Sequence, residues 1–355
     1  MSDQFVGTMQ VQERQRFDVA ALQRYLGQYI EGFSGPLTVE QFKGGQSNPT
    51  FRLSAGGRVY AMRAKPGPAA KLLPSAHAVD REYRVISALG KAGMPVPRTW
   101  CLCEDEGVIG RAFFVMDCVE GRVLWDQSLP GMTGAQRAAI YDEMNRVIAS
   151  LHGVDYAAIG LADYGKPGNY FARQIGRWSR QYRASETEAI EAMDQLIAWL
   201  PGNIPEGDET SVVHGDYRLD NLIFHPAEPR ILAILDWELS TLGHPLADFS
   251  YHCMSWHIPP GAFRGIAGLD LAELGIPGES EYIDAYCRRT GRDGIGNWDF
   301  YLAYNLFRLA AILQGIRKRA LEGTAASQQA HDAGSRARPL AELGWQYAEK
   351  SMQKN

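Results

Sequence analysis

One segment of the chain concentrates side chains that can transfer protons, bind metal ions and hold phosphates. It reads His214-Gly215-Asp216-Tyr217-Arg218-Leu219-Asp220-Asn221, and Asp236 stands fifteen residues after Asn221. Apolar, strand-like runs at 212–213, 222–224 and 231–235 flank these polar residues. Several carboxylates and an amide would therefore lie at the ends of buried strands. Such burial is costly unless the groups are paired, so the pattern indicates a function rather than packing alone.

The spacing of these residues suits phosphoryl transfer. Asp216 would accept the proton of an attacking hydroxyl. The amide oxygen of Asn221 and the carboxylate of Asp236 would hold magnesium on nucleotide phosphates, because Mg²⁺ prefers oxygen ligands.

These residues resemble the aminoglycoside phosphotransferase and choline kinase superfamily, small-molecule kinases with a protein-kinase-like fold. His214-x-Asp216-x4-Asn221 is similar to the family's catalytic loop, and Asp236 is similar to its metal-binding aspartate. The resemblance implies that Asp216 is the catalytic base, that Asn221 and Asp236 bind Mg²⁺, and that ATP is the donor. His214 would be a structural member of the loop.

The segment after Asp236 extends the resemblance. Leu242-Gly243-His244-Pro245-Leu246-Ala247-Asp248 is similar to the family's next motif, although the family usually has aspartate where His244 stands. The resemblance implies that Asp248 supports the catalytic loop through hydrogen bonds. The alternative for Asp248 is a helix N-cap or a surface carboxylate.

Within the superfamily, the chain looks most like the phosphotransferase-like domains found beside or fused to acyl-CoA dehydrogenases. The resemblance covers most of residues 36–330 and implies a pathway shared with such a dehydrogenase. The matching segments are Gly44-Gly45-Gln46-Ser47-Asn48, Met116-Asp117, and Arg308 with Gln314-Gly315.

The N-terminal part supplies a candidate nucleotide site. Strand alternation places Ala61 and Arg63 on one face, as a small residue under adenine and a cation at the phosphates require. Protein kinases use lysine here, but arginine offers a bidentate fork to phosphate. Glu82, in the following helix, is the expected ion-pair partner of Arg63. The alternative is a surface arginine and a solvated glutamate.

Two further segments are expected to bind the nucleotide. The loop Gly44-Gly45-Gln46-Ser47-Asn48 would let backbone amides approach phosphate. It lies between two predicted strands, so it is neither a Walker A loop nor a Rossmann fingerprint, and an ordinary glycine hairpin is the alternative. Met116 to Cys118 would offer backbone groups to adenine from the linker between lobes.

Local patterns predict the elements that carry these residues. A helix at 18–31 with Asp18 as N-cap precedes three glycine-linked strands at 37–42, 50–53 and 59–63. A helix at 75–89 follows, then two strands within 108–119 around a turn at Gly110. Beyond Gly121 the spacing of apolar residues mostly predicts helices, at 133–152, at 170–182 and as two helices between 298 and 351.

The predicted fold class is α+β, a two-lobed protein-kinase-like fold. Its domains would be an N-terminal helical extension at 1–35, a nucleotide-binding lobe with an antiparallel sheet and a helix at 36–117, and a larger, mainly helical lobe at 118–355. The larger lobe would carry the catalytic loop and the acceptor site.

Composition excludes several classes of protein. The 355 residues contain 36 Lys and Arg against 41 Asp and Glu, a formal net charge of −5, so a nucleic-acid partner is not expected. Five scattered cysteines fit a reducing compartment better than a disulfide framework. With neither a signal peptide nor a membrane span recognisable, we expect a cytoplasmic protein. The spacing of His244, His252 and His257 is not that of a zinc site.

The acceptor is less well defined than the donor. Residues 300–340 contain two acidic side chains, Glu322 and Asp332, but six basic ones: Arg308, Arg317, Lys318, Arg319, Arg336 and Arg338. This surplus favours an anionic small-molecule acceptor such as a hydroxyacyl-CoA over an aminoglycoside or choline-type substrate. Glu238 and Arg308 are the candidate acceptor-side residues.

Three alternative functions compete with this one. A dinuclear-metal phosphoesterase would need an Asp-x-His and an Asn-His pair, which the sequence lacks. A protein kinase would need more than the eleven residues between Asp236 and Asp248 to seat a peptide. A non-catalytic module that binds nucleotide or acyl-CoA stays open, although Asp216, Asn221 and Asp236 are all intact.

Overall fold

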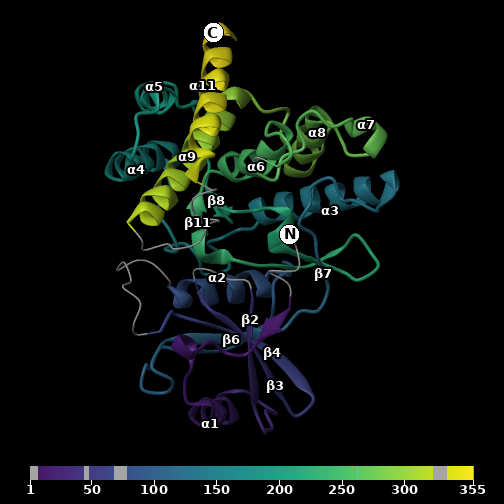
Figure 1. Ribbon diagram of the computed structural model, residues 1–355. Helices are drawn as coiled ribbons and strands as arrows, with labels where there is room; N and C mark the ends of the chain where they lie inside the picture. The colour runs from purple at the N-terminus through teal and green to yellow at the C-terminus, as the bar shows by residue number, and fades with distance from the viewer. Residues whose placement is uncertain (1–6, 44–47, 68–77, 262, 323–333, 355) are drawn as a thin grey trace. The chain divides into compact units, whose positions relative to one another are not determined.

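The computed structural model describes residues 7–43, 48–67, 78–261, 263–322 and 334–354 (Figure 1). Their contacts divide the chain into two compact units. Unit 1 comprises residues 1–125, 157–164 and 220–240, and unit 2 comprises residues 126–156, 165–219 and 241–355. The boundaries predicted at residues 35 and 117 stay predictions.

Unit 1 contains a six-stranded sheet in the order β1-β2-β3-β4-β6-β5, with every neighbouring pair antiparallel. The strands are β1 (Thr8–Met9), β2 (Thr38–Phe42), β3 (Thr50–Ala55), β4 (Arg58–Ala64), β5 (Thr99–Cys103) and β6 (Phe113–Asp117). The three glycine-linked strands predicted from the sequence are confirmed as β2, β3 and β4.

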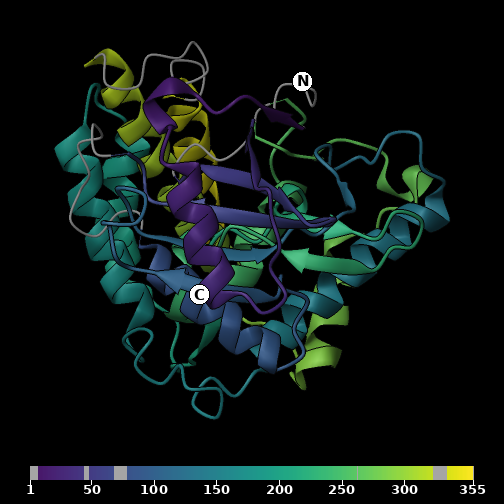
Figure 2. The same ribbon diagram turned by 90° about the horizontal axis from the view of Figure 1, so that it is seen from below.

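The two faces of this sheet are covered by different helices (Figures 1 and 2). On one face α1 (Val19–Tyr29), with Asp18 as its N-cap, packs Leu22 and Leu26 against Met62 and other apolar residues of the sheet. On the other face lies α2 (Val79–Lys91). Because side chains alternate along β4, Arg63 points away from the α1 face, on which Met62 lies.

Unit 1 also contains a small antiparallel sheet in the order β10-β9-β7. Its strands are β7 (Arg122–Val123), β9 (Leu222–Phe224) and β10 (Ile231–Ile234), and a 3-10 helix at Trp237–Leu239 follows β10. Leu222 pairs with Ile234, so the residue before β9 and the residues after β10 lie at the same end of this hairpin.

One predicted strand is wrong. We expected two strands around Gly110, but residues 106–109 form a turn and the additional strand is β5 at Thr99–Cys103. Ile109 is buried and Val108 packs against the α1-side core, so their apolar character reflects burial of a turn. In β5 it is Cys101 and Cys103 that face this core.

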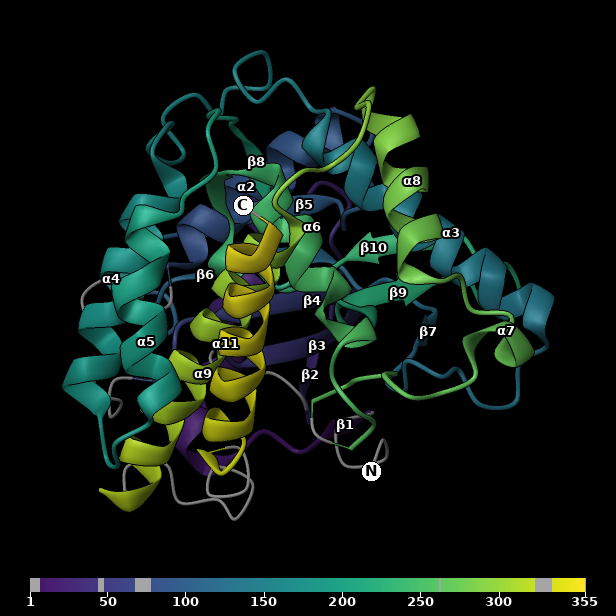
Figure 3. The same ribbon diagram turned by 90° about the horizontal axis from the view of Figure 1, so that it is seen from above.

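Unit 2 is mainly helical. Its helices are α3 (Gly134–His152), α4 (Tyr170–Ser185), α5 (Glu191–Trp199), α6 (Pro245–Cys253), α7 (Leu271–Leu274), α8 (Glu279–Thr290), α9 (Trp298–Leu321) and α11 (Ala337–Lys354). α9 is the central helix, most of its side chains are buried, and α4, α5, α6 and α11 pack around it (Figure 3). The aromatic side chains of Tyr170, Trp178 and Tyr182 on α4 are buried in the core.

Two short strands of unit 2, β8 (Ser211–Val213) and β11 (Thr241–Gly243), form an antiparallel pair. β8 leads directly into His214, and β11 leads into α6.

The predicted fold class is confirmed, with an antiparallel sheet and helix in the first part of the chain and a mainly helical second part. None of the helices in the described part of the chain combines the length and apolar character that a membrane span requires.

Candidate functional site

In unit 1, the predicted metal ligands lie at one end of the β9–β10 hairpin. Asn221 comes immediately before β9, and Asp236 comes two residues after β10. The N–H of Leu235 donates a 2.8 Å hydrogen bond to the carbonyl of Asn221, which joins the two chain segments. The fold therefore brings together an amide and a carboxylate separated by fifteen residues, and both can offer oxygen to Mg²⁺.

Asp236 has a left-handed backbone, with φ of 65° and ψ of 61°. Aspartate tolerates this region better than most residues, but few residues other than glycine adopt it. The Asp236 carboxylate accepts a 2.7 Å bond from Nη2 of Arg63. The predicted metal ligand and the predicted phosphate-binding cation thus contact each other.

The predicted ion pair between Arg63 and Glu82 is present and buried. Nε of Arg63 lies 2.7 Å from Oε2 of Glu82, and Nδ2 of Asn48 donates to Oε1 of Glu82 at 2.9 Å. Glu82 is only 2% exposed, and burial raises the pKa of its carboxyl while the charge of Arg63 counteracts this rise. Glu238 lies 3.4 Å from Arg63. Three carboxylates therefore surround one guanidinium, which leaves a local negative excess suited to a cation.

The residues predicted to contact adenine lie on neighbouring strands. Ala61 of β4 is paired directly with Met116 of β6, and both are buried. Cys118 follows β6 and is half-buried. Gly44, Gly45, Gln46 and Ser47, predicted to approach phosphate, lie outside the described residues.

In unit 2, Asp248 of α6 holds the loop that follows β8. Its two carboxylate oxygens accept bonds from the backbone N–H groups of His214, at 2.7 Å, and of Gly215, at 2.8 Å. His152 lies 3.3 Å from the same carboxylate. Burial would raise the pKa of Asp248, but these hydrogen bonds and the nearby histidines lower it. The hydrogen bonds expected from Asp248 to the loop are thus present.

The Asp216 carboxylate is held from both sides. Its Oδ1 accepts a 2.6 Å hydrogen bond from the hydroxyl of Tyr251, and its Oδ2 lies 3.2 Å from Nη2 of Arg218. The sequence patterns predict no role for Tyr251 or Arg218. Arg218 lies inside the recognised motif, so its position two residues after Asp216 was a usable signal, whereas Tyr251 is 35 residues away and gave none.

Arg308, predicted on the acceptor side, is 7% exposed, and its Nη2 donates a 2.7 Å bond to the carbonyl of Gly215. Gly215 has a φ of 81°, a conformation that glycine adopts without strain. Arg308 therefore holds the turn that carries Asp216. Glu238, the other acceptor-side candidate, lies in unit 1 beside Arg63.

The basic surplus near the C-terminus is a weaker guide than the sequence indicated. Arg317 and Arg338 both pair with Glu188, and Lys318 donates to the carbonyl of Ala184 at 2.7 Å. These cations are engaged within unit 2, so counting charges between 300 and 340 overstated the positive charge open to a substrate.

The histidines have structural partners. His244 caps α6 by accepting from the N–H of Leu246. His252 bonds to the Tyr282 hydroxyl at 2.8 Å, and His257 bonds to Glu279. Burial lowers the pKa of His244 and of His252 to about 4, so both are neutral near pH 7.

Comparison with known proteins decides the family. Residues 38–301 match the phosphotransferase enzyme family. The chain belongs to that family. Its relatives include mouse acyl-CoA dehydrogenase family member 10, which is 46% identical over 93% of this chain, and human acyl-CoA dehydrogenase family member 11, which is 40% identical over 96%. The matches span 31% and 44% of those longer proteins.

Solved structures agree with this assignment. A Ralstonia eutropha protein provisionally named an aminoglycoside phosphotransferase is 65% identical, with a TM-score of 0.88 over 94% of this chain and 99% of that one. A thermostable aminoglycoside phosphotransferase mutant, solved with ADP and hygromycin B, is 14% identical, with a TM-score of 0.60 over 92% of this chain and 98% of that one. The second likeness supports the fold alone.

Proposed function

We propose that this phosphotransferase moves the γ-phosphoryl group of Mg·ATP to a hydroxyl of a small metabolite. The observation that carries the proposal is the placement of Asn221 and Asp236 at one end of the β9–β10 hairpin, with Arg63 bonded to Asp236. An amide, a carboxylate and an arginine held by a buried glutamate form a set suited to Mg²⁺ and phosphate.

Asn221 and Asp236 would hold Mg²⁺. Their oxygen donors and the negative excess around Arg63 fit a divalent cation, which neutralises phosphate charge when bound. Arg63 would contact phosphate oxygens. Ala61, Met116 and Cys118 are proposed to bind adenine.

Asp216 is proposed as the catalytic base. As the acceptor oxygen bonds to the γ-phosphorus, the bond from phosphorus to the β–γ bridging oxygen breaks, ADP leaves, and the hydroxyl proton passes to Asp216. Asp248 and Arg308 would keep the backbone of this loop fixed, and His214 would serve it structurally. The position of the Asp216 carboxylate matters because the correct placement of reacting groups supplies much of the catalysis in such reactions.

For the acceptor we propose an anionic alcohol, with a hydroxyacyl-CoA as the leading candidate. The similarity to acyl-CoA dehydrogenase family members supports this class and a place in a pathway with such a dehydrogenase. An aminoglycoside or choline-type acceptor is the competing substrate class. A non-catalytic nucleotide- or acyl-CoA-binding module is the competing function.

Nucleotide binding and turnover test this proposal separately. By calorimetry, the chain should bind the ATP analogue AMP-PNP more tightly with Mg²⁺ than without it, and Asp236→Ala should remove that difference. Asp216→Asn should still bind Mg·AMP-PNP but lose phosphoryl transfer in a metabolite screen. Asp284→Asn, on the exposed face of α8, is the matched control. Full turnover by Asp216→Asn would refute the assignment of the base.

A further inference from the structure

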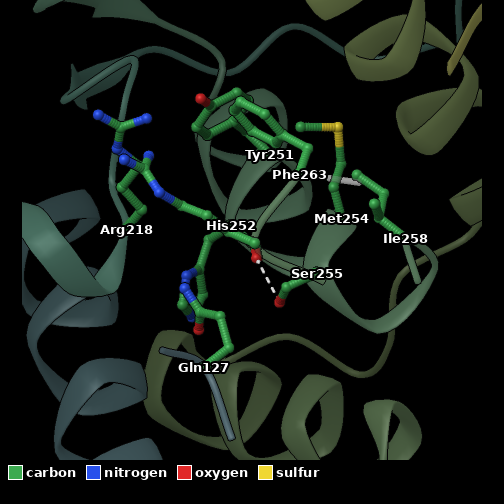
Figure 4. Close-up of a pocket in the computed structure, with 9 residues that line it drawn as sticks. Gln127, Arg218, Tyr251, His252, Met254, Ser255, Ile258 and Phe263 are labelled. Atoms are coloured by element: carbon green, nitrogen blue, oxygen red, sulfur yellow. Dashed lines mark hydrogen bonds between the residues drawn. The ribbon is translucent and has the colours of Figure 1, made fainter. Parts of the chain in front are cut away.

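Residues 157–164, between α3 and α4, belong to unit 1, although both helices belong to unit 2. The segment contacts α2, which carries Glu82, and the turn that follows Asp236. These contacts involve other residues than the pocket in Figure 4, which Arg218 and Tyr251 of unit 2 line. The partners of the segment lie next to the residues proposed to bind phosphate and Mg²⁺.

Tyr164, at the end of this segment, contacts both elements through its hydroxyl. The residue is 1% exposed, and its hydroxyl oxygen lies 2.7 Å from Oγ of Ser240 and 3.4 Å from the carbonyl of Arg81. Ser240 donates its own proton to the carbonyl of Trp237 at 2.5 Å, so the hydroxyl of Tyr164 is the donor toward Ser240. Burial raises the pKa of Tyr164, which keeps this donor protonated.

Two arginines of α2, Arg81 and Arg84, bind the same segment. Nη2 of Arg81 donates a 2.8 Å hydrogen bond to the carbonyl of Tyr164, and its guanidinium lies 4.2 Å from the centre of the Tyr164 ring. Nη2 of Arg84 donates to the carbonyl of Gly160 at 2.8 Å and pairs with Asp163. Residues three apart in a helix lie on one face, so one face of α2 is attached to the segment at two points.

The start of α2 depends on such contacts. The helix begins at Val79, and the methyl group of the preceding Ala78 cannot cap it. The first turn of a helix leaves backbone N–H groups without partners inside the helix, so this turn frays unless neighbouring groups hold it. Glu82 lies in this turn, next to Arg81, and its carboxylate holds Nε of Arg63 at 2.7 Å.

We propose that residues 157–164 brace the residues proposed to bind Mg²⁺ and phosphate, with Tyr164 as a positioning residue. One of its contacts fixes the turn of α2 that carries Glu82, and the other fixes the turn that carries Asp236. Arg63 bonds to both carboxylates, so a shift of either turn would move its guanidinium. The inference rests on the proposed phosphotransferase function and deepens it by naming a residue that acts on the Mg²⁺ site through other residues.

The Mg²⁺ dependence of AMP-PNP binding, measured by calorimetry on the full chain, tests the brace. Tyr164→Phe should reduce the gain in affinity that Mg²⁺ confers by roughly threefold to tenfold, the factor expected from the loss of one hydrogen bond. Tyr25→Phe is the matched control in the same unit, because the Tyr25 hydroxyl donates to the carbonyl of Leu102 at 3.1 Å. This control should keep the full gain.

Urea unfolding of the same two variants separates positioning from stability. A hydroxyl with a merely structural role would lower the stability of Tyr164→Phe and leave the Mg²⁺-dependent gain intact, which would overturn the proposal. Loss of the gain in a variant that is still folded at the assay temperature supports it.

Two further substitutions test the contacts of the brace. Ser240→Ala should also reduce the gain, and its effect should be less than additive with that of Tyr164→Phe, because both remove the same contact. Arg81→Gln replaces an exposed side chain, so it tests the brace even where Tyr164→Phe fails to fold, and it should reduce the gain as well. Arg24→Gln, exposed on α1, is its control.

The failures of the two proposals can be distinguished. If the unmodified chain binds Mg·AMP-PNP but Tyr164→Phe and Arg81→Gln keep the full gain, or if the effects of Tyr164→Phe and Ser240→Ala are additive, the brace is wrong and the proposed function stands. If the unmodified chain binds AMP-PNP no more tightly with Mg²⁺ than without it, the proposed function itself fails.

Discussion

The hydroxyl of Tyr251, on α6, donates a 2.6 Å hydrogen bond to Oδ1 of Asp216. Burial and the charge of Asp216 raise the pKa of Tyr251, so the hydroxyl stays protonated and remains a donor. We infer that Tyr251 is a positioning residue that orients the proposed base. This contact links α6, which also holds the backbone of the loop after β8 through Asp248, to the proposed base in that loop.

Tyr251→Phe should lower kcat by roughly tenfold to a hundredfold, because a hydrogen bond to a charged group contributes about 1.5–3 kcal/mol. The affinity for Mg·AMP-PNP should stay unchanged, because Tyr251 contacts the proposed base. Steady-state kinetics and calorimetry measure the two quantities, and an unchanged kcat would exclude the positioning role. Tyr29→Phe, at an exposed tyrosine of α1, is the control.

Glu82→Ala should destabilise the protein by about 3 kcal/mol, because removing one partner of a buried ion pair leaves the other charge uncompensated. The same change should weaken Mg·AMP-PNP binding, since Arg63 loses the group that holds its Nε. Urea unfolding and calorimetry measure the two effects. Glu104→Ala, an exposed carboxylate in the same unit, should shift stability by under about 0.5 kcal/mol. Equal stability of the two variants would show that the buried pair is not important for folding.

Stability should fall between pH 7 and pH 5. His244 and His252 have pKa values lowered to about 4 by burial, against about 6.5 when unfolded. Between these values the unfolded state binds more protons, so stability is present above about pH 6.5 and is lost as pH falls toward 4. Each histidine should contribute about 2 kcal/mol of this loss at pH 5.

His244→Asn isolates one of these contributions, because asparagine can still cap α6. The stability difference between pH 7 and pH 5, measured by urea unfolding, should shrink by about 2 kcal/mol in this variant. An undiminished difference in His244→Asn would mean that His244 is not held neutral by burial.

Much of the site could be predicted because its signals are local. His214, Asp216 and Asn221 lie within eight residues, and the alternation of β4 placed Ala61 and Arg63 on one face. The pairing of Arg63 with Glu82 followed from a cation on a strand and a carboxylate on the next helix. Roles drawn from these residues stay predictions, but their contacts are those expected.

The missed features depend on contacts between distant segments. Tyr251 reaches Asp216 only through the packing of α6 beside β8, which no sequence pattern reveals. The charge count at 300–340 failed as a guide because Arg317 and Arg338 find a partner, Glu188, far away in the sequence. Val108 was predicted in a strand because a buried turn and a buried strand both contain apolar residues.

The account depends most directly on phosphoryl transfer from Mg·ATP that requires Asp216. The decisive measurement incubates the chain with γ-labelled ATP, Mg²⁺ and a metabolite library that includes hydroxy acids and their CoA esters, and follows label in small molecules by mass spectrometry. We predict transfer to an anionic alcohol by the unmodified chain, and none by Asp216→Asn although it still binds Mg·AMP-PNP. Absence of any labelled acceptor, or equal labelling by the variant, would contradict the account.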